Sequence, residues 1–218
     1  MDSPKVKQIS CVIYDCDGVL FDSIDANRRL YNHICASVGR ALLTDSELQY
    51  CHTHTVFEAI RFLFPDDEAA EKRALEFLKN RVDLKEFVEY LIMEPHLLQA
   101  LEALRQKKII TAISTNRTTS MKHIMEKFKL WAYFDMVVTA LDVEHPKPDR
   151  ESVEKILAAF DVKREEALFI GDSEVDKKTA EASGVRFLAY KTRHLSDAFI
   201  DDHLALLDLL SNGTAPQV

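Results

Sequence analysis

The chain contains 218 residues, of which 47% are apolar, and it carries a formal net charge of −8. This length allows one large domain or two small ones, and the acidic balance argues against nucleic acid as a partner. An anionic substrate remains compatible with the sequence, because a bound metal ion reverses the local electric field.

The first predicted strand ends in two acids. Cys11 to Tyr14 form a short apolar run, which predicts a buried strand over residues 11–14. Asp15 and Asp17 follow at once, and residues i and i+2 of an extended chain face the same side. Two adjacent carboxylates repel each other unless a cation lies nearby. Gly18 then permits a sharp turn or a close approach, so this strand end needs a positively charged partner.

A helical region follows over roughly residues 24–90. Apolar residues recur there at helical spacing, Gly39 can end the first helix, and Thr44 with Glu47 predicts a capping box that begins the second. No convincing strand interrupts the region. We therefore expect a small all-helical unit over residues 23–94.

From Pro95 onward, predicted strands and helices alternate. The strands are expected over residues 109–114, 136–139, 167–171 and 186–190, and the helices over residues 96–106, 119–129, 150–160, 174–183 and about 197–210. This alternation implies an α/β fold in which a Rossmann-like parallel sheet carries helices on both faces. Residues 1–22 and 95–218 would form this core, and the helical unit would be an insert. Ligands of open parallel sheets bind at the carboxyl ends of the strands.

Polar residues gather at these strand ends. They are Asp15, Asp17, Ser114, Thr115, Asn116, Lys147, Asp172, Ser173 and Asp176. Lys147 lies between two prolines, which hold the backbone extended and so direct the side chain. Single residues have ordinary alternatives: Thr115 and Asn116 suit turns, Asp176 suits a helix cap, and Lys147 alone suits a solvated surface charge.

Taken together, four motifs resemble those of the haloacid dehalogenase-like hydrolase superfamily. DCDGVLFDS is similar to its first motif, STN to its second, HPKPD to its third and GDSEVD to its fourth, in the expected order. The helical insert between the first two motifs resembles the cap domain of the phosphoglycolate phosphatase and β-phosphoglucomutase branch. The resemblance covers most of the chain.

The resemblance implies a Mg²⁺ ion held by Asp15, Asp172 and the backbone carbonyl of Asp17, with Asp176 as an outer or alternate ligand. It also implies that Asp15 is the nucleophile that forms an aspartyl phosphate. Asp17 would protonate the leaving oxygen and then accept a proton from water. An acid at residue 17 suits a phosphate ester, whose alkoxide leaving group needs a proton.

The resemblance also implies how the phosphate is held. Lys147 would offset the crowded carboxylates and reach the phosphate. Thr115 and the amides near Gly18 would donate hydrogen bonds to it, and Ser114 and Asn116 are candidates at the same strand end.

In the expected cap, the segment CHTHT, residues 51–55, is predicted to be a loop before the third helix. His52, Thr53 and His54 are candidates there for contacts with the leaving group, and a solvated loop without function is an equal alternative.

These residues favour a Mg²⁺-dependent phosphatase that acts on a small phosphorylated metabolite. The first alternative is a phosphosugar mutase. The second is a non-catalytic binding protein on the same scaffold, which the presence of all the motif residues disfavours.

The remaining expectations concern compartment and partners. The four cysteines form neither a CxxC pair nor a metal-ligand spacing, which favours free thiols. The chain begins without the apolar stretch of a signal peptide, and no apolar run is long enough to span a bilayer. We expect a cytoplasmic protein with no membrane or nucleic-acid partner, either a monomer or a homodimer.

Overall fold

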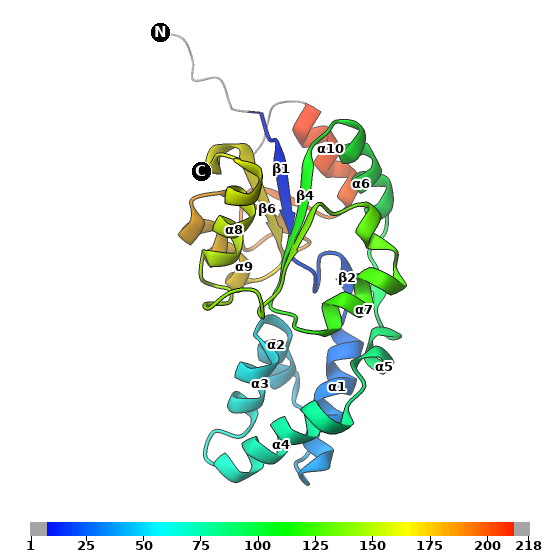
Figure 1. The fold of residues 1–218 in the computed structure, drawn as a ribbon, viewed down its shortest axis with the longest axis vertical. Helices are drawn as coiled ribbons and strands as arrows, with labels where there is room; N and C mark the ends of the chain where they lie inside the picture. Colours follow the sequence, from blue (N-terminus) through cyan, green and yellow to red (C-terminus); the bar gives the residue numbers. More distant parts are fainter. Residues whose placement is uncertain (1–7, 212–218) are drawn as a thin grey trace.

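A six-stranded parallel sheet forms one half of the elongated molecule, and a group of helices forms the other half (Figure 1). The structure is a computed structural model that describes residues 8–211. The predicted core also includes residues 1–7 and 212–218, which lie outside the described residues. The predicted α/β fold, a Rossmann-like sheet with a helical insert, is confirmed.

The strands of the sheet lie in the order β5-β4-β1-β6-β7-β8, and each neighbouring pair is parallel. Their bounds are Cys11–Tyr14 for β1, Ile110–Ser114 for β4, Met136–Val138 for β5, Ala167–Gly171 for β6, Arg186–Tyr190 for β7 and Phe199–Ile200 for β8. The chain runs outward from β1 to β5 and then returns to the other side of β1. The strand order therefore reverses beside β1, which is where ligands of open α/β sheets bind.

Helices cover both faces of this sheet (Figure 1). One face carries α6 (Leu97–Gln106), α7 (Ser120–Lys127) and α10 (His203–Ser211), and the other carries α8 (Glu151–Phe160) and α9 (Glu174–Ser183). Short 3-10 helices, η1 (Leu130–Ala132) and η2 (Arg164–Glu166), precede β5 and β6. Val12 and Tyr14 pack into the first apolar cluster, whereas Cys11 and Ile13 pack into the second. Side chains alternate along a strand, so β1 is apolar throughout because both of its faces are covered.

The helical unit, defined here as α1 to α5, has an apolar cluster of its own. Its helices are α1 (Ile24–Ser37), α2 (Asp45–Thr53), α3 (Val56–Leu63), α4 (Glu68–Arg81) and α5 (Leu84–Val88). Ile34 and Ile60 are fully buried in a cluster separate from those of the sheet. Thr44 begins α2 through the predicted capping box with Glu47, and Thr55 begins α3 in the same way. Capping boxes satisfy amide groups that a helix start would otherwise leave unpaired.

The chain enters and leaves the helical unit through two short antiparallel strands, β2 (Phe21–Asp22) and β3 (Ile92–Met93). The sequence analysis predicts neither strand, because a run of two residues has no measurable periodicity. The pairing brings the start and the end of the insert side by side.

Two further predictions are wrong in detail. The helix expected over about 197–210 begins only at His203, because Phe199 and Ile200 pair with β7 as the edge strand β8. The segment at 51–55 is also not a loop: it continues α2 as far as Thr53. Thr55 already caps α3, so almost no connecting chain remains between the two helices.

The four cysteines are buried and unpaired, as predicted. Within residues 8–211, no helix has both the length and the apolarity that a membrane span requires.

Candidate active site

Polar side chains follow three neighbouring strands at the same edge of the sheet. Asp15 follows β1, Thr115 follows β4 and Asp172 follows β6, and these strands are neighbours in the sheet. The amide of Asp15 donates to the carbonyl of Ile170 (2.9 Å), so the ladder continues one residue past β1 and fixes the backbone of Asp15. The convergence expected at the carboxyl ends of the strands is thus present at the point where the strand order reverses.

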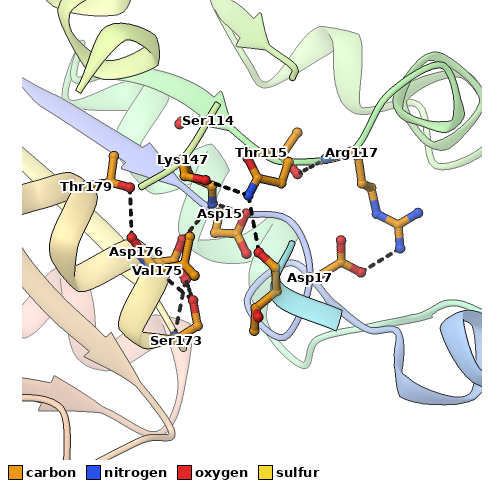
Figure 2. A network of polar contacts seen from close by, with 12 residues as sticks. Asp15, Asp17, Ser114, Thr115, Arg117, Lys147, Ser173, Val175, Asp176 and Thr179 are labelled. Atoms are coloured by element: carbon orange, nitrogen blue, oxygen red, sulfur yellow. Dashed lines mark hydrogen bonds and ion pairs between the residues drawn. The ribbon is translucent and has the colours of Figure 1, made fainter. Parts of the chain in front are cut away.

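Lys147 lies between the carboxylates of Asp15 and Asp176, as Figure 2 shows. Its Nζ is 2.7 Å from Asp15 Oδ1 and 2.6 Å from Asp176 Oδ1, and its side chain is 3% exposed. Burial lowers the pKa of Lys147, but the two carboxylates raise it by more, so the ammonium stays charged. The alternative of a solvated surface lysine is therefore excluded.

Asp176 combines both of the interpretations that the sequence allows. Its Oδ2 accepts from the Ser173 amide (3.2 Å) and hydroxyl (2.5 Å), which completes a capping box at the start of α9. Its Oδ1 meets Lys147. The helix cap holds the carboxylate in place, and the same carboxylate orients the lysine.

Asp15, Asp172 and Asp176 form the carboxylate cluster, in which one oxygen from each lies within 4.8 Å of the others. Burial raises the pKa of Asp15 to about 7, against the opposing Lys147 ammonium. Burial, and then the negative charge of Asp176, raise the pKa of Asp172 well above its usual range. These carboxylates are more crowded than the lysine alone can offset, and such a site favours binding of a further cation.

The backbone at Gly18 contributes to the same cluster. Gly18 has a φ of +72°, and a Cβ placed there would overlap the carboxylate of Asp172. Only glycine combines this conformation with so close an approach. The donor set is made of the carboxylate oxygens of Asp15, Asp172 and Asp176, and carboxylate oxygens are ligands that Mg²⁺ prefers. These three side chains, which the resemblance assigns to a magnesium ion, therefore fit one.

Asp17 lies beside this cluster and is held through one oxygen. Its Oδ1 accepts from Arg117 Nη2 (2.6 Å), from Asn27 Nδ2 (3.3 Å) and from the Ser23 hydroxyl. Its Oδ2 makes no hydrogen bond to any of the described residues. Burial raises the pKa of Asp17, but Arg117 and then His52 outweigh this effect, so the pKa is lowered. The side chain is therefore fixed through Oδ1, and Oδ2 remains available for a ligand.

Arg117 is a site residue that the sequence analysis missed. Its side chain is 12% exposed, and its buried Nε has no hydrogen-bond partner among residues 8–211. Arg117 directly follows the STN motif, so extending the inspection of that strand end by one residue would have found it. With Arg117 included, four carboxyl groups face two cations at this strand edge, which is a formal excess of two negative charges when all four are ionised.

Asn27 is the second missed residue, and it connects two predicted ones. Its amide nitrogen donates to Asp17 and also lies 2.9 Å from Nδ1 of His52. A nitrogen that donates to a carboxylate is an NH₂ group, so Nδ1 of His52 must accept and Nε2 must carry the proton. Burial lowers the pKa of His52, which keeps the ring neutral. No sequence signal marks Asn27, which lies within the amphipathic helix α1.

The other predicted residues differ in position. Asn116 donates to the carbonyls of Thr53 (3.2 Å) and Lys147 (3.0 Å), so it joins the helical unit to the sheet. Nδ1 of His54 contacts the Tyr50 carbonyl, and its ring stacks on that tyrosine. The Ser114 hydroxyl pairs with Ser152, and Ser114 does not line the cavity described next.

A cavity of about 700 Å³ lies between the sheet edge and the helical unit. The carboxylate cluster, Asp17, Thr115 and Lys147 line its sheet side, and His52, Thr53 and His54 line its helical side. The structure thus brings most of the predicted residues to one cavity.

Comparison with known proteins agrees with this geometry. A family model described as haloacid dehalogenase-like hydrolase matches residues 12–190. The crystal structure of a HAD-superfamily hydrolase, subfamily IA, variant 1, from Geobacter sulfurreducens is 37% identical with a TM-score of 0.75, and the match covers 96% of this chain and 100% of that chain.

Two further proteins are more distant. The phosphorylated carbohydrates phosphatase of Thermotoga maritima is 28% identical over 87% of this chain and 88% of its own. CbbY from Rhodobacter sphaeroides, solved with xylulose-(1,5)bisphosphate, has a TM-score of 0.74 over 89% of this chain and 95% of that one. At 18% identity, the second likeness concerns the fold alone. Because the family model spans most of the sequence, the chain belongs to the haloacid dehalogenase-like hydrolase family of enzymes.

Proposed function

We propose that the protein is a Mg²⁺-dependent phosphatase that hydrolyses a phosphate monoester through an aspartyl phosphate on Asp15. The arrangement of Asp17 carries this proposal. Three donors fix its Oδ1, while Oδ2 is left free beside the carboxylate cluster. A residue that passes a proton to a leaving group and takes one from water needs one anchored and one free oxygen.

In the first half of the reaction, a carboxylate oxygen of Asp15 attacks phosphorus and the bond from phosphorus to the ester oxygen breaks. Oδ2 of Asp17 supplies the proton that the departing alkoxide needs. Asp17 takes up this proton from solvent when the phosphate binds, because the negative charge of the phosphate opposes the lowering of its pKa by Arg117. Lys147 holds Asp15 in position, and the Thr115 hydroxyl, which accepts from the Arg117 amide (3.1 Å), keeps its own proton to donate to a phosphate oxygen.

In the second half, Asp17 accepts a proton from water, and the resulting hydroxide attacks the aspartyl phosphate at phosphorus. Inorganic phosphate leaves and the carboxylate of Asp15 is restored. Asp15, Asp172 and the backbone carbonyl of Asp17 would hold the magnesium ion, with Asp176 outside them. The ion would offset the two excess negative charges, so that a phosphate dianion can approach.

The domain organisation belongs to the same proposal. Residues 1–22 and 95–218 act as the catalytic core, and residues 23–94 act as a cap over the cavity. The separate apolar cluster of the helical unit supports this division. The contacts of Asp17 with Ser23 and Asn27 support a cap that lies against the catalytic residues. The Thermotoga maritima relative, named as a phosphatase of phosphorylated carbohydrates, supports the reaction type.

Trapping the intermediate tests the proposal. In Asp17→Asn, an aryl phosphate with a good leaving group should still phosphorylate Asp15, while hydrolysis slows by roughly 10²–10⁴-fold. Acid quenching followed by peptide mass spectrometry should therefore find phosphate on Asp15. Asp15→Asn should show none, and Asp161→Asn, a change at an exposed position, should behave like the wild type.

The opposite results are equally clear. Absence of phosphate from Asp15 in every rapid-quench sample would support direct attack by water. Phosphate on another residue would mean that the nucleophile is assigned wrongly. Turnover that depends on a bisphosphate activator, without net release of phosphate, would favour a mutase.

A further inference from the structure

Part of the helical side of the cavity is apolar. Its aliphatic side chains come from four helices and the segment between two of them. We define the apolar wall as Leu30, Val56, Leu75, Leu78, Val82 and Leu84. All six are partly exposed and line the cavity.

Helix α4 contributes a continuous part of this wall. Leu75, Leu78 and Val82 are spaced at i, i+3 and i+7, so they share one face of the helix and its C-terminal extension. Leu75 and Leu78 also pack against the apolar cluster of the helical unit, and the rest of their surface faces the cavity. Apolar surface in contact with water is unfavourable, and a ligand that covers it gains the corresponding free energy.

The charged groups of the cavity are distributed unevenly, although uncharged polar residues such as His52 and Thr53 also line the helical side. The carboxylates, Lys147 and Arg117 are concentrated at the sheet edge. Two charged residues on the helical side, Lys79 and Asp83, are exposed and can stay hydrated when the cavity is occupied. A bound phosphate at the sheet edge would therefore direct the remainder of its ester toward the apolar wall.

The size of the cavity adds a second argument. About 700 Å³ lies within the range of roughly 300–1,000 Å³ that is usual for sites of drug-sized ligands. A two-carbon ester would leave most of the apolar wall in contact with water. A polyhydroxylated group of larger size would fill the space, but the hydroxyls placed against the apolar wall would find no hydrogen-bond partner, and only those that reach polar side chains such as His52 and Thr53 would be paired.

We propose that the substrate is a phosphate monoester whose organic part is largely apolar, an alkyl or aryl group of about six carbons or more. This inference rests on the proposed phosphatase function for its reaction, whereas the binding preference stands on the apolar wall alone. The phosphate occupies the sheet edge, and the hydrocarbon part covers Leu75, Leu78 and their neighbours.

A series of alkyl phosphates tests the preference at nearly constant leaving-group pKa. Full burial of a methylene corresponds to about a fourfold gain, so kcat/KM should rise by at least about tenfold from ethyl to hexyl phosphate. A hexitol phosphate, with the same number of carbons and a hydroxyl on every carbon except the one that carries the phosphate, should show no such gain over ethyl phosphate. Equal kcat/KM for the hexyl and hexitol esters would overturn the inference.

Two variants connect the effect to the wall. Leu78→Asn, and the isosteric Val82→Thr in case the first variant folds poorly, should reduce the dependence of kcat/KM on chain length. Leu42→Asn provides a matched control, because Leu42 is 67% exposed and does not line the cavity. A slope unchanged in both wall variants would contradict the proposed contact.

Binding of alkylphosphonates separates this inference from the proposed function, because their carbon–phosphorus bond resists hydrolysis. Calorimetry should give a tighter Kd for hexylphosphonate than for ethylphosphonate, with a more negative heat-capacity change as apolar surface is buried. If this gain appears but no ester is hydrolysed, the binding inference holds and the phosphatase function fails. If esters are hydrolysed but the Kd values do not differ, the function holds and the inference fails.

Discussion

Lys147→Met should destabilise the protein strongly, because it removes the buried cation between Asp15 and Asp176. The ammonium lies 2.7 Å and 2.6 Å from these carboxylates, and its side chain is only 3% exposed. Removing one partner of a buried ion pair typically costs about 3–5 kcal/mol, since the remaining charge is left uncompensated. For a chain of this length, each kcal/mol shifts Tm by roughly 2–4 °C, so we expect Tm to fall by about 6–20 °C.

Urea denaturation in excess chelator measures this cost without any contribution from a metal ion. The matched control is Lys122→Met, which removes a lysine whose side chain is 73% exposed and should change the free energy of unfolding by no more than about 0.5 kcal/mol. Added Mg²⁺ should recover part of the loss in Lys147→Met, because the ion supplies positive charge at the same place. A loss below about 1 kcal/mol in chelator would refute the assignment of Lys147 as the main charge compensation of the cluster.

Two further predictions concern backbone geometry and pH. Gly18→Ala should lose more stability than Gly39→Ala, because both positions have positive φ but only the first would overlap the carboxylate of Asp172, whereas nothing lies within 4 Å of a Cβ at Gly39. Equal losses in urea denaturation would remove the argument for a close approach. Burial lowers the pKa of His203 below 6.5, so below this pH the imidazole is protonated in the unfolded chain but stays neutral in the folded protein. The free energy of unfolding therefore falls as the pH drops below 6.5. His203→Gln, in which the amide can still donate to Val19, should reduce the slope of unfolding free energy against pH between 6.5 and 5.0, and an unchanged slope would contradict this account.

The predicted residues that the structure brings together at the sheet edge share one property: they follow strands. Asp15, Thr115 and Asp172 each end an apolar run, and a parallel sheet brings such positions to one edge whatever the details of packing. Lys147 was recognisable because two prolines restrict its backbone. These positions depend on local pattern and on fold class, and both can be read from a single sequence.

Other parts of the site depend on contacts between distant segments. Asn27 meets His52 and Asp17 only because α1 and α2 pack against each other beside the sheet edge, and no periodicity encodes that meeting. The edge strand β8 was not predicted for a related reason: its two residues form a strand only because they pair with β7. The apolar wall belongs to the same class, because Leu75 and Leu78 read as ordinary core positions of an amphipathic helix.

The side chain of Asn116 forms a weak latch, by which we mean a single hydrogen bond that joins the helical unit to the sheet edge. Its two amide hydrogens reach the carbonyl of Thr53 in the helical unit and the carbonyl of Lys147 beside the sheet. Any rotation that swings the helical unit outward breaks the first of these bonds and leaves the second in place. One hydrogen bond is worth about 0.5–1.5 kcal/mol, so the latch favours the closed arrangement by roughly twofold to tenfold and no more. A bias of that size would permit opening by thermal motion, and each closure would re-form the bond from Asn116 to the Thr53 carbonyl while the bond to the Lys147 carbonyl is kept throughout.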